Sequence, residues 1–331
     1  MKIGIVLHPY GEDQPAGLAR TIFELTKGML GTDSENEYII FLKRKPRVIP
    51  ALPGSNWRVH ILGEGLLWLH RLKKAPLCDV TIFNTPVLPL WYRPRHAIVL
   101  ALDFAYYYFP PRGFKATLLN WFTFWYHRRS LLRANRIVAI SYATKQDTIK
   151  LFHIAPEKID VVWCGFKDVC ASAQIAINTP EKFFLFIGVM KARKNVFNVV
   201  RAFRSICDQF PDFTLVLGGR AEGGYVDEMK RYIKKEGIEQ RVLFIGHLND
   251  GQLSFLYRKA YALVFASFIE GFGYPVLEAM ACGTPVITSK TTSLGEICQN
   301  GSALLVDPSR VDELASAMER VVVNPQLRDE L

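Results

Sequence analysis

The amino-acid sequence predicts an α/β protein made of two doubly wound parallel sheets. Three observations support this fold class. Short apolar runs alternate with segments of helical periodicity in both halves of the chain, which is typical of βαβ units. The chain has 331 residues, half of them apolar, and this is enough to bury two cores. A polar, weakly patterned segment at 171–180 ends on proline and predicts a boundary between domains 1–172 and 180–331.

In the first half, apolar runs predict the strands, and longer amphipathic segments predict the helices between them. The expected strands are Ile3–Leu7, Tyr38–Leu42, Val80–Phe83, Ala97–Leu100 and Arg136–Ile140. The expected helices are Gly17–Met29, Lys115–Arg133 and Ala143–Phe152.

The second half repeats this alternation more regularly. The expected strands are Phe183–Ile187, Phe213–Leu217, Arg241–Ile245, Tyr261–Phe265, Pro285–Thr288 and Ala303–Val306. The expected helices are Asn195–Phe210, Tyr225–Glu236, Asp250–Arg258, Tyr274–Ala281 and Val311–Val323. Two such sheets are expected to face each other across a cleft, with ligands bound where the strands end.

Composition narrows the class of protein further. No apolar run reaches the roughly 18 residues that a membrane-spanning helix needs, and the N-terminus is read as a first strand rather than a signal peptide. The cysteines are scattered without a C-x-x-C pair, which predicts reduced thiols in a cytosolic chain and neither a disulfide nor a metal site. They are Cys78, Cys164, Cys170, Cys207, Cys282 and Cys298.

The excess of positive charge lies in the first half. Residues 1–175 hold 23 Lys/Arg against 13 Asp/Glu, whereas residues 176–331 hold 18 of each. Surfaces of one sign attract phosphates, nucleic acid or anionic lipid. Nucleic acid is not expected as a partner, because the chain carries no recognised groove-reading or single-strand-binding motif.

Within the basic half, the segment Phe114–Arg136 mixes aromatic residues with arginines at helical spacing. Leu118, Trp121, Phe122 and Trp125 are expected on one helix face. Two interpretations remain open. One is an interfacial segment that lies on an anionic membrane surface. The other is a core helix with a basic outer face. Burial of the apolar side in the core is favoured, although the aromatic run at 105–111 supports the membrane interpretation.

The segment Ser267–Glu278, S-F-I-E-G-F-G-Y-P-V-L-E, is the most informative part of the chain. It follows an apolar strand and leads into a helix that opens with Pro275, so it predicts a strand, a glycine loop and a helix N-terminus. Backbone N–H groups at such a terminus bind phosphates or carboxylates. Glu270 precedes the loop and Glu278 lies in the helix, so the two carboxylates can hold separate parts of a hydroxyl-rich ligand.

A family resemblance supports this reading. The second half resembles the nucleotide-sugar domain of glycosyltransferase family 4, of the GT-B fold with two Rossmann-like domains, and the two glutamates match the family's E-x7-E pair. The matching motifs are F-L-F-I-G-V-M-K-A-R-K-N (184–195), L-V-L-G-G (215–219), R-V-L-F-I-G-H-L-N-D-G-Q-L (241–253), the run at 260–289, S-L-G-E-I-C (293–298) and A-L-L-V-D-P (303–308). The first half matches less tightly, at 15–20, 133–141 and 158–165.

The resemblance implies roles for charged residues of the second half. Lys194, assisted by Arg193 or Lys191, would neutralise a nucleoside diphosphate leaving group, because fixed cations stabilise charge that develops during the reaction. Glu270 would face the hydroxyls of the donor sugar. Glu278 would accept hydrogen bonds from the ribose.

Backbone groups are implied in donor binding as well. Gly188 ends the strand before Lys194, and the N–H groups of Phe272, Gly273 and Tyr274 would point at sugar and phosphate. His247 lies in the strip beside the base. The family generally needs no metal, and no cofactor is expected apart from the donor itself.

In the first domain, Gly17 is expected in the glycine turn that opens the first long helix, opposite the diphosphate. Asp103 occupies the place of the aspartate in the family's His-Asp pair near the acceptor, but Leu102 replaces the histidine. The family's histidine commonly contacts the donor sugar, so its replacement affects which sugar, and how much transferase activity, the resemblance implies.

The resemblance implies a retaining glycosyltransferase that moves a hexose, with mannose or rhamnose favoured, from a nucleoside diphosphate sugar. The acceptor would be a glycan or a lipid-linked acceptor in bacterial cell-surface polysaccharide or lipopolysaccharide synthesis. The expected location is the cytoplasm, or peripherally the inner face of the cell membrane. The alternative is a non-catalytic nucleotide-sugar binding protein of the same fold. The sequence stops after the last expected helix, which suggests a chain that lacks the C-terminal crossover helix.

Overall fold

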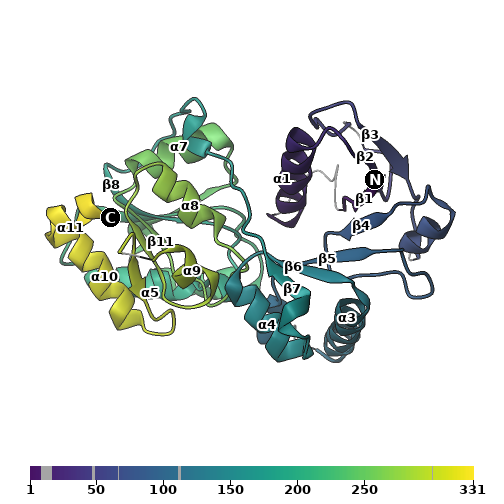
Figure 1. Cartoon of the computed structure of the whole chain (residues 1–331). Helices are drawn as coiled ribbons and strands as arrows, with labels where there is room; N and C mark the ends of the chain where they lie inside the picture. The colour runs from purple at the N-terminus through teal and green to yellow at the C-terminus, as the bar shows by residue number, and fades with distance from the viewer. Residues whose placement is uncertain (9–16, 47–48, 66, 111–112, 300) are drawn as a thin grey trace. The chain divides into compact units, whose positions relative to one another are not determined.

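The computed structural model describes residues 1–8, 17–46, 49–65, 67–110, 113–299 and 301–331, with the backbone alone at 17–20. It contains two compact units, Met1–Gly165 (unit 1) and Phe166–Leu331 (unit 2). Each unit consists of a parallel sheet covered by helices (Figure 1). The α/β class and the two Rossmann-like, doubly wound parallel sheets expected from the sequence are therefore confirmed.

Unit 1 holds a seven-stranded parallel sheet in the order β3-β2-β1-β4-β5-β6-β7. Its strands are β1 (Lys2–Val6), β2 (Glu37–Leu42), β3 (Trp57–Ile61), β4 (Val80–Phe83), β5 (Ala97–Ala101), β6 (Arg136–Ala139) and β7 (Ile159–Val161). Its helices are α1 (Gly17–Thr32), α2 (Ala105–Tyr108), α3 (Phe114–Arg133) and α4 (Tyr142–Phe152), with 3-10 turns at Trp68–Lys74 and Pro156–Lys158.

The two outermost strands of this sheet, β3 and β7, were not among the sequence predictions. In β3 the residues W-R-V-H-I alternate in type and none is fully buried, because an edge strand pairs on one side only. The strand β7 has only three residues and a charged one, Asp160, at its centre. Neither therefore shows the continuous apolar run that marked the inner strands.

Unit 2 holds a six-stranded parallel sheet in the order β10-β9-β8-β11-β12-β13. Its strands are β8 (Lys182–Ile187), β9 (Phe213–Gly218), β10 (Val242–Gly246), β11 (Ala262–Phe265), β12 (Val286–Ser289) and β13 (Leu304–Val306). All six coincide with expected strands to within a residue or two.

The helices of unit 2 lie on both faces of this sheet, with α5 and α10 on one side and α7 and α8 on the other (Figure 1). They are α5 (Val196–Ile206), α6 (Gly224–Lys235), α7 (Asp250–Lys259), α8 (Tyr274–Ala281), α9 (Thr292–Ile297), α10 (Val311–Val323) and α11 (Pro325–Glu330), with 3-10 turns at Val169–Ala171, Ala192–Lys194 and Glu239–Arg241. The short helices α9 and α11 were not predicted.

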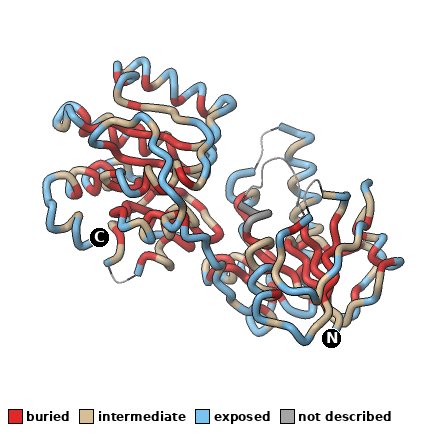
Figure 2. The backbone as a smooth tube through the Cα atoms, turned by 90° about the horizontal axis from the view of Figure 1, so that it is seen from above, coloured by how far each residue is buried: buried red, intermediate tan, exposed pale blue. Residues whose placement is uncertain are grey.

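The cores follow from this layering. Strands β9, β11 and β12 are buried at every position, and β8 is exposed only at Lys182. Such continuous burial is the mark of a parallel sheet covered on both faces. Figure 2 shows the buried residues as red strands inside paler helices and loops in each unit.

The cysteines correct one prediction. Cys170 and Cys282 form a disulfide with Cα atoms 5.5 Å apart, whereas the sequence predicted that all six thiols are reduced. The bond joins the 3-10 turn Val169–Ala171, at the start of unit 2, to the C-cap of α8. The two residues are 112 positions apart, so no local spacing could reveal the pair.

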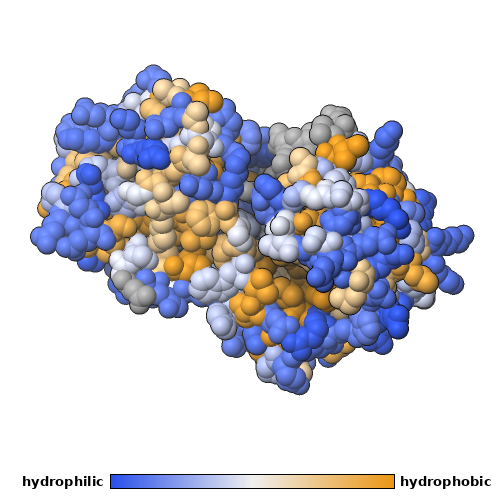
Figure 3. Space-filling view, turned by 45° about the horizontal axis from the view of Figure 1, so that its top comes forward, coloured by the Kyte–Doolittle hydropathy of each residue, from blue (hydrophilic) through white to orange (hydrophobic). Residues whose placement is uncertain are grey.

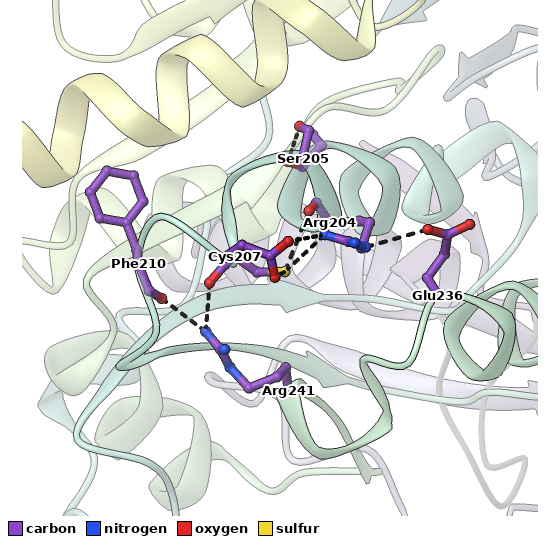
Figure 4. A network of polar contacts seen from close by, with 8 residues as sticks. Arg204, Ser205, Cys207, Phe210, Glu236 and Arg241 are labelled. Atoms are coloured by element: carbon purple, nitrogen blue, oxygen red, sulfur yellow. Dashed lines mark hydrogen bonds and ion pairs between the residues drawn. The ribbon is translucent and has the colours of Figure 1, made fainter.

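The amino edge of the unit 2 sheet is held by two arginines (Figure 4). Arg204, near the end of α5, donates to Asp208 at 2.8 Å and forms an ion pair with Glu236 at 3.3 Å. Arg241 donates to the carbonyls of Phe210 and Phe213 at 2.8 and 2.6 Å. These contacts fix the turns where β9 and β10 begin. They therefore support the fold at the amino edge of the sheet, opposite to the edge where the carboxyl ends of the strands lie.

The helix α3 faces outward with its apolar side. Leu118, Trp121, Phe122 and Trp125 are all exposed, so the favoured prediction of a core helix is wrong for this face. The opposite side of α3 packs instead, through Phe124, which stacks on Phe152 with ring centroids 4.8 Å apart. Among the described residues, no helix is long and apolar enough to cross a membrane.

Candidate functional site

The site in unit 2 lies at the point where the strand order reverses. From β8 the chain moves to β9 on one side, and later to β11 on the other side of β8. Loops that leave β8 and β11 at their carboxyl ends therefore diverge, and open α/β sheets bind ligands at this position. Lys194 follows β8 and Glu270 follows β11, so both predicted charged residues come from these two loops.

Lys194 and Glu270 form an ion pair between the ammonium Nζ and the carboxylate Oε1. Their side chains are 14% and 9% exposed. The ammonium also lies over the ring of Phe265, the last residue of β11, at 5.1 Å from the ring centroid. A shielded pair of this kind interacts more strongly than a solvated one, because little water screens it.

Arg193 adds a second cation to the same carboxylate. Its Nη1 lies 3.7 Å from Oε2 of Glu270 and 3.4 Å from the carbonyl of Ile269. Its own carbonyl accepts a hydrogen bond from the N–H of Phe268 at 2.9 Å. Two cations thus face one carboxylate, and fixed cations of this kind suit an anionic ligand.

A residue that the sequence analysis missed holds these loops together. Asn195 is 2% exposed and adopts a left-handed conformation with φ of 58°. Its Nδ2 donates to the carbonyl of Ala266 at 2.9 Å and to that of Pro308 at 2.6 Å. Asparagine tolerates this conformation better than most residues. It therefore ends the turn that carries Lys194, delays the start of α5 by one residue, and ties the β8 loop to the β11 loop.

The glycine loop ends at Gly273, which is the N-cap of α8 with φ of 121°. A Cβ atom there would lie 2.6 Å from Cδ2 of Leu294, so both the backbone conformation and the packing require glycine. Phe272 is 5% exposed and its ring meets that of Tyr274 edge to face at 5.5 Å. In the first turn of α8, Pro275 has no N–H and the N–H of Val276 donates to the carbonyl of Gly273 at 3.0 Å. That the N–H groups of Phe272, Gly273 and Tyr274 point at a ligand stays a prediction.

Glu278 lies in α8 at a buried position, with 3% of the residue exposed. Its Oε2 accepts a hydrogen bond from the hydroxyl of Tyr257 at 3.1 Å. The main-chain carbonyl of Tyr257 accepts from Thr284 at 2.6 Å. This hydrogen bonding holds the carboxylate in one orientation.

The remaining predicted residues of unit 2 lie along the same edge of the sheet. Gly188 follows β8, and its N–H donates to Gly218 at 2.9 Å. The glycine that brings these loops close is Gly219, where a Cβ atom would lie 2.1 Å from the carbonyl oxygen of Gly188. His247 is exposed directly after β10.

In unit 1, Gly17 is the first residue of α1, and the rest of the expected glycine turn lies outside the described residues. Asp103 is exposed after β5 and accepts a hydrogen bond from the N–H of Ala105 at 3.1 Å. The structure therefore shows Asp103 as the residue that orders the start of α2. Leu102, which stands in place of the family's histidine, packs partly against the core around β1 and accepts through its carbonyl from Thr144 at 3.2 Å.

Within the part of the chain that the structure describes, no group of three His, Cys, Asp or Glu residues gathers closely enough to hold a metal ion. The arrangement in unit 2 offers cations, backbone N–H groups and carboxylates. These are the groups that recognise phosphates and hydroxyls.

Two family models match the chain and give its class. The model for Glycosyltransferase Family 4 matches residues 17–168, and the model for Glycosyl transferases group 1 matches residues 171–331. The chain therefore belongs to the group 1 glycosyltransferases of family 4. It is a glycosyltransferase of the GT-B type.

Two relatives and one solved structure show how near the likeness is. The chain is 28% identical to the O-antigen chain mannosyltransferase RfbU of Salmonella typhimurium over 265 residues, which cover 80% of this chain and 70% of that protein. It is 30% identical to an Escherichia coli O-antigen chain mannosyltransferase B over 56% of this chain and only 51% of that protein. The crystal structure of HepE from Anabaena with UDP and glucose has a TM-score of 0.75 and 18% identity, covering 99% of this chain and 91% of HepE. At that identity the likeness concerns the fold alone.

Proposed function

We propose that this chain is a retaining glycosyltransferase that transfers a hexose, mannose or rhamnose, from a nucleoside diphosphate sugar. The acceptor would be a glycan or a lipid-linked acceptor in the synthesis of a bacterial cell-surface polysaccharide. The observation that carries the proposal is the Lys194–Glu270 pair, with Arg193 beside it, at the switch point of the unit 2 sheet.

In this proposal the cations receive the leaving group. As the bond between the sugar C1 and the diphosphate oxygen breaks, negative charge develops on the diphosphate. Lys194 and Arg193 stabilise that charge most in the transition state, because they are fixed before the reaction begins. Glu270, which is already turned toward both cations, directs its carboxylate to the hydroxyls of the sugar.

The reaction needs no covalent intermediate on the protein. The acceptor hydroxyl approaches C1 from the face that the diphosphate leaves, and its proton passes to an oxygen of the departing phosphate. One C–O bond forms as the other breaks, and the sugar keeps its configuration at C1. The protein supplies positioning and charge, with Glu278 on the ribose and Asp103 on the acceptor side.

Several observations support the choice of donor and pathway. Both relatives described above are named as O-antigen chain mannosyltransferases, which favours mannose. HepE was crystallised with UDP and glucose, which supports a nucleoside diphosphate as the recognised unit. We place the reaction in the cytoplasm, at the inner face of the cell membrane.

Leu102 motivates a second candidate function, a nucleotide-sugar binding protein without transferase activity. Members of the family commonly use a histidine at this position, and a leucine side chain cannot donate a hydrogen bond to a donor sugar. Under this alternative the chain would bind the donor tightly and release it unchanged.

A thermal-shift panel of nucleoside diphosphates and their mannose, rhamnose and glucose derivatives tests the proposal. A ligand at 100 times its dissociation constant stabilises the folded state by about 2.7 kcal/mol, which moves a transition by roughly 5–10 °C in a unit of this size. The best ligand is then incubated with acceptor extracts, and sugar transfer is followed. Binding with transfer supports the enzyme, binding without transfer favours the alternative, and no binding by any member overturns both.

The variant Lys194→Met should lose the shift. Lys182→Met is the matched control, because Lys182 is an exposed lysine at the opposite end of the same strand, β8, where it pairs with Asp212 at 3.5 Å. An equal loss in both variants would contradict the role of Lys194.

A further inference from the structure

The helix α3 presents a continuous apolar stripe to solvent. Phe114, Leu118, Trp121 and Trp125 follow one another at spacings of three or four residues and are all exposed, Phe114 to 86% and Trp121 to 65%. Residues at these spacings lie on one side of a helix. Single exposed apolar side chains are ordinary. Figure 3 shows hydrophobic residues, in orange, grouped at several places on the visible face. A stripe of large aromatic residues along one helix marks an interaction surface instead.

The stripe is held outward by contacts on the other side of α3. Tyr126 donates its hydroxyl to the carbonyl of Leu88 at 2.6 Å. His127 forms a hydrogen bond with the hydroxyl of Tyr106 at 2.9 Å. Together with the stacked pair of Phe124 and Phe152, these contacts occupy the inner face of the helix. The aromatic stripe therefore has no role in the core of unit 1.

The stripe itself is ordered. The rings of Phe122 and Trp125 are 5.6 Å apart and tilted by 32°. Trp125 also stacks on Tyr126, with centroids 6.4 Å apart. Ring contacts of this kind limit the rotamers of the exposed side chains, so the surface is preorganised and loses little entropy when it is covered.

The stripe continues into a cluster of positive charges. Arg128 is exposed one turn after Trp125, and the cluster is completed by Arg93, Arg129, Arg133 and Lys158. We call these five residues the basic cluster. The guanidinium groups of Arg129 and Arg133 both donate to the carbonyl of Leu90, at 2.8 and 3.0 Å, which holds them side by side. Lys158 donates to the carbonyl of Leu132 at 2.7 Å.

Four charges of the basic cluster, those of Arg93, Arg129, Arg133 and Lys158, are close enough to affect one another. The pKa of Arg133 is lowered by burial and then by the charges of Arg129 and Arg93. Burial, followed by Arg93, also lowers the pKa of Lys158. Across the described residues, no carboxylate forms an ion pair with any member of the basic cluster. An unbalanced group of cations is favourable when an anionic surface is near.

Two acidic residues near this surface, Asp160 and Asp147, are already engaged. The segment 114–136 contains five Lys/Arg and no Asp or Glu. Asp160 is bound by Arg136 through two hydrogen bonds at 2.5 and 3.0 Å. On the side of α2, Asp147 accepts the hydroxyl of Tyr108 at 2.5 Å. No described carboxylate therefore lies on the stripe to repel an anion.

We propose that the apolar stripe of α3 and the basic cluster form one docking surface for an anionic lipid bilayer. The tryptophan and phenylalanine rings would enter the boundary between headgroups and acyl chains, where such rings are favoured. The cations of the basic cluster would contact the lipid phosphates. From Phe114 to Leu132 the surface runs roughly 27 Å along the helix. This docking goes beyond the transfer reaction and does not depend on which sugar is transferred.

Charge complementarity favours a bilayer over a second copy of the chain. A pair of copies that met through the same face would bring two identical stripes, each with its cations and without a carboxylate, into contact. Such like-charge contacts are unfavourable. A bilayer that contains anionic lipid supplies the missing negative charge and the apolar layer together.

Co-sedimentation of the whole chain with vesicles tests the proposal. The vesicles contain phosphatidylcholine alone or phosphatidylcholine with added phosphatidylglycerol. We expect the chain to sediment with the anionic vesicles and much less with the neutral ones. Each basic residue near an anionic surface contributes about 1 kcal/mol, so Arg128→Gln should lower the partition coefficient about fivefold. Trp121→Ser should lower it on both vesicle types.

The controls come from unit 2. Lys259→Gln removes one exposed charge and Val323→Ser removes one exposed apolar side chain outside the stripe, and neither should change sedimentation. Equal losses in the controls and in the α3 variants would overturn the proposal. The proposal would also be overturned if the chain stays in the supernatant with anionic vesicles. A third contrary outcome is a chain that binds no vesicles but forms a dimer that Trp121→Ser abolishes. Donor binding, measured by thermal shift, should be unchanged in Arg128→Gln, which separates docking from the transfer reaction.

Discussion

The ion pair between Lys194 and Glu270 allows the sharpest test of the site. Replacing one partner leaves the other in a place that water barely reaches, and losing half of a buried pair generally costs about 3–5 kcal/mol. Here Arg193 stays 3.7 Å from the carboxylate and Lys194 is 14% exposed. We therefore expect losses below this range: the free energy of unfolding should fall by about 2 kcal/mol in Lys194→Met and by about 1 kcal/mol in Glu270→Gln.

The double variant should be less destabilised than the sum of the two single variants. With both charges removed, only Arg193 loses its carboxylate, and its side chain is 27% exposed. We therefore expect a coupling energy of about 1–1.5 kcal/mol. Urea unfolding of the wild-type chain and the three variants, followed by far-ultraviolet circular dichroism, measures this quantity. A coupling energy near zero would refute the reasoning, because it would mean that the two side chains do not share a screened environment.

The same variants separate folding from function. Stability should partly return in the double variant, whereas donor binding should not, because binding needs both the cation and the carboxylate. Losing a charged hydrogen bond costs about 1.5–3 kcal/mol, which corresponds to roughly ten- to a hundredfold in affinity or in kcat/KM. Recovery of donor binding together with stability would show that the pair serves the fold only.

Three further predictions concern particular residues. Asn195→Ala should lower the free energy of unfolding by about 2–3 kcal/mol in urea denaturation, because two buried carbonyls lose their donor. Asn195→Gly should recover only the part of this loss that comes from the left-handed backbone conformation. Gly273→Ala should destabilise by about 2 kcal/mol or more, since φ is 121° and the new Cβ would lie 2.6 Å from a leucine methyl, whereas Gly283→Ala, in open space, should cost about half as much or less. Burial lowers the pKa of His127 to about 4 from 6.5, so between these two values the unfolded chain binds more protons. Stability should therefore fall by up to about 3 kcal/mol from about pH 7 to about pH 4, and His127→Gln should flatten that dependence in urea titrations at each pH.

The inner strands could be predicted from the sequence because they carry their own signal. In β8 and β9 almost every residue is apolar, so the pattern shows burial on both faces directly. The edge strands β3 and β7 lack that signal. Their pairing is set by a neighbouring strand, as when Trp57 pairs with Tyr38, and pairing between distant segments is invisible in local composition.

The outward face of α3 was predicted wrongly for a related reason. Helical spacing shows that Leu118, Trp121 and Trp125 share a face, but it does not show whether that face points toward the core. Arg129, Arg133 and Tyr126, which flank this face, donate hydrogen bonds to carbonyls of the segment 88–90, and these bonds fix how the helix is turned. A rule that sends aromatic residues inward fails where the polar residues have the stronger partners.

The candidate site shows the same division between local and distant information. Glu270 could be found because it stands in one segment with the glycine loop and the helix N-terminus that follow it. Asn195 could not, because its partners at Ala266 and Pro308 are 71 and 113 residues away. Yet Asn195 ends the turn that presents Lys194 to Glu270, so the geometry of the pair depends on it. A loop motif can therefore indicate which chemistry a site offers, but the precision of the site comes from buried hydrogen bonds that join distant loops, and these must be read from the structure.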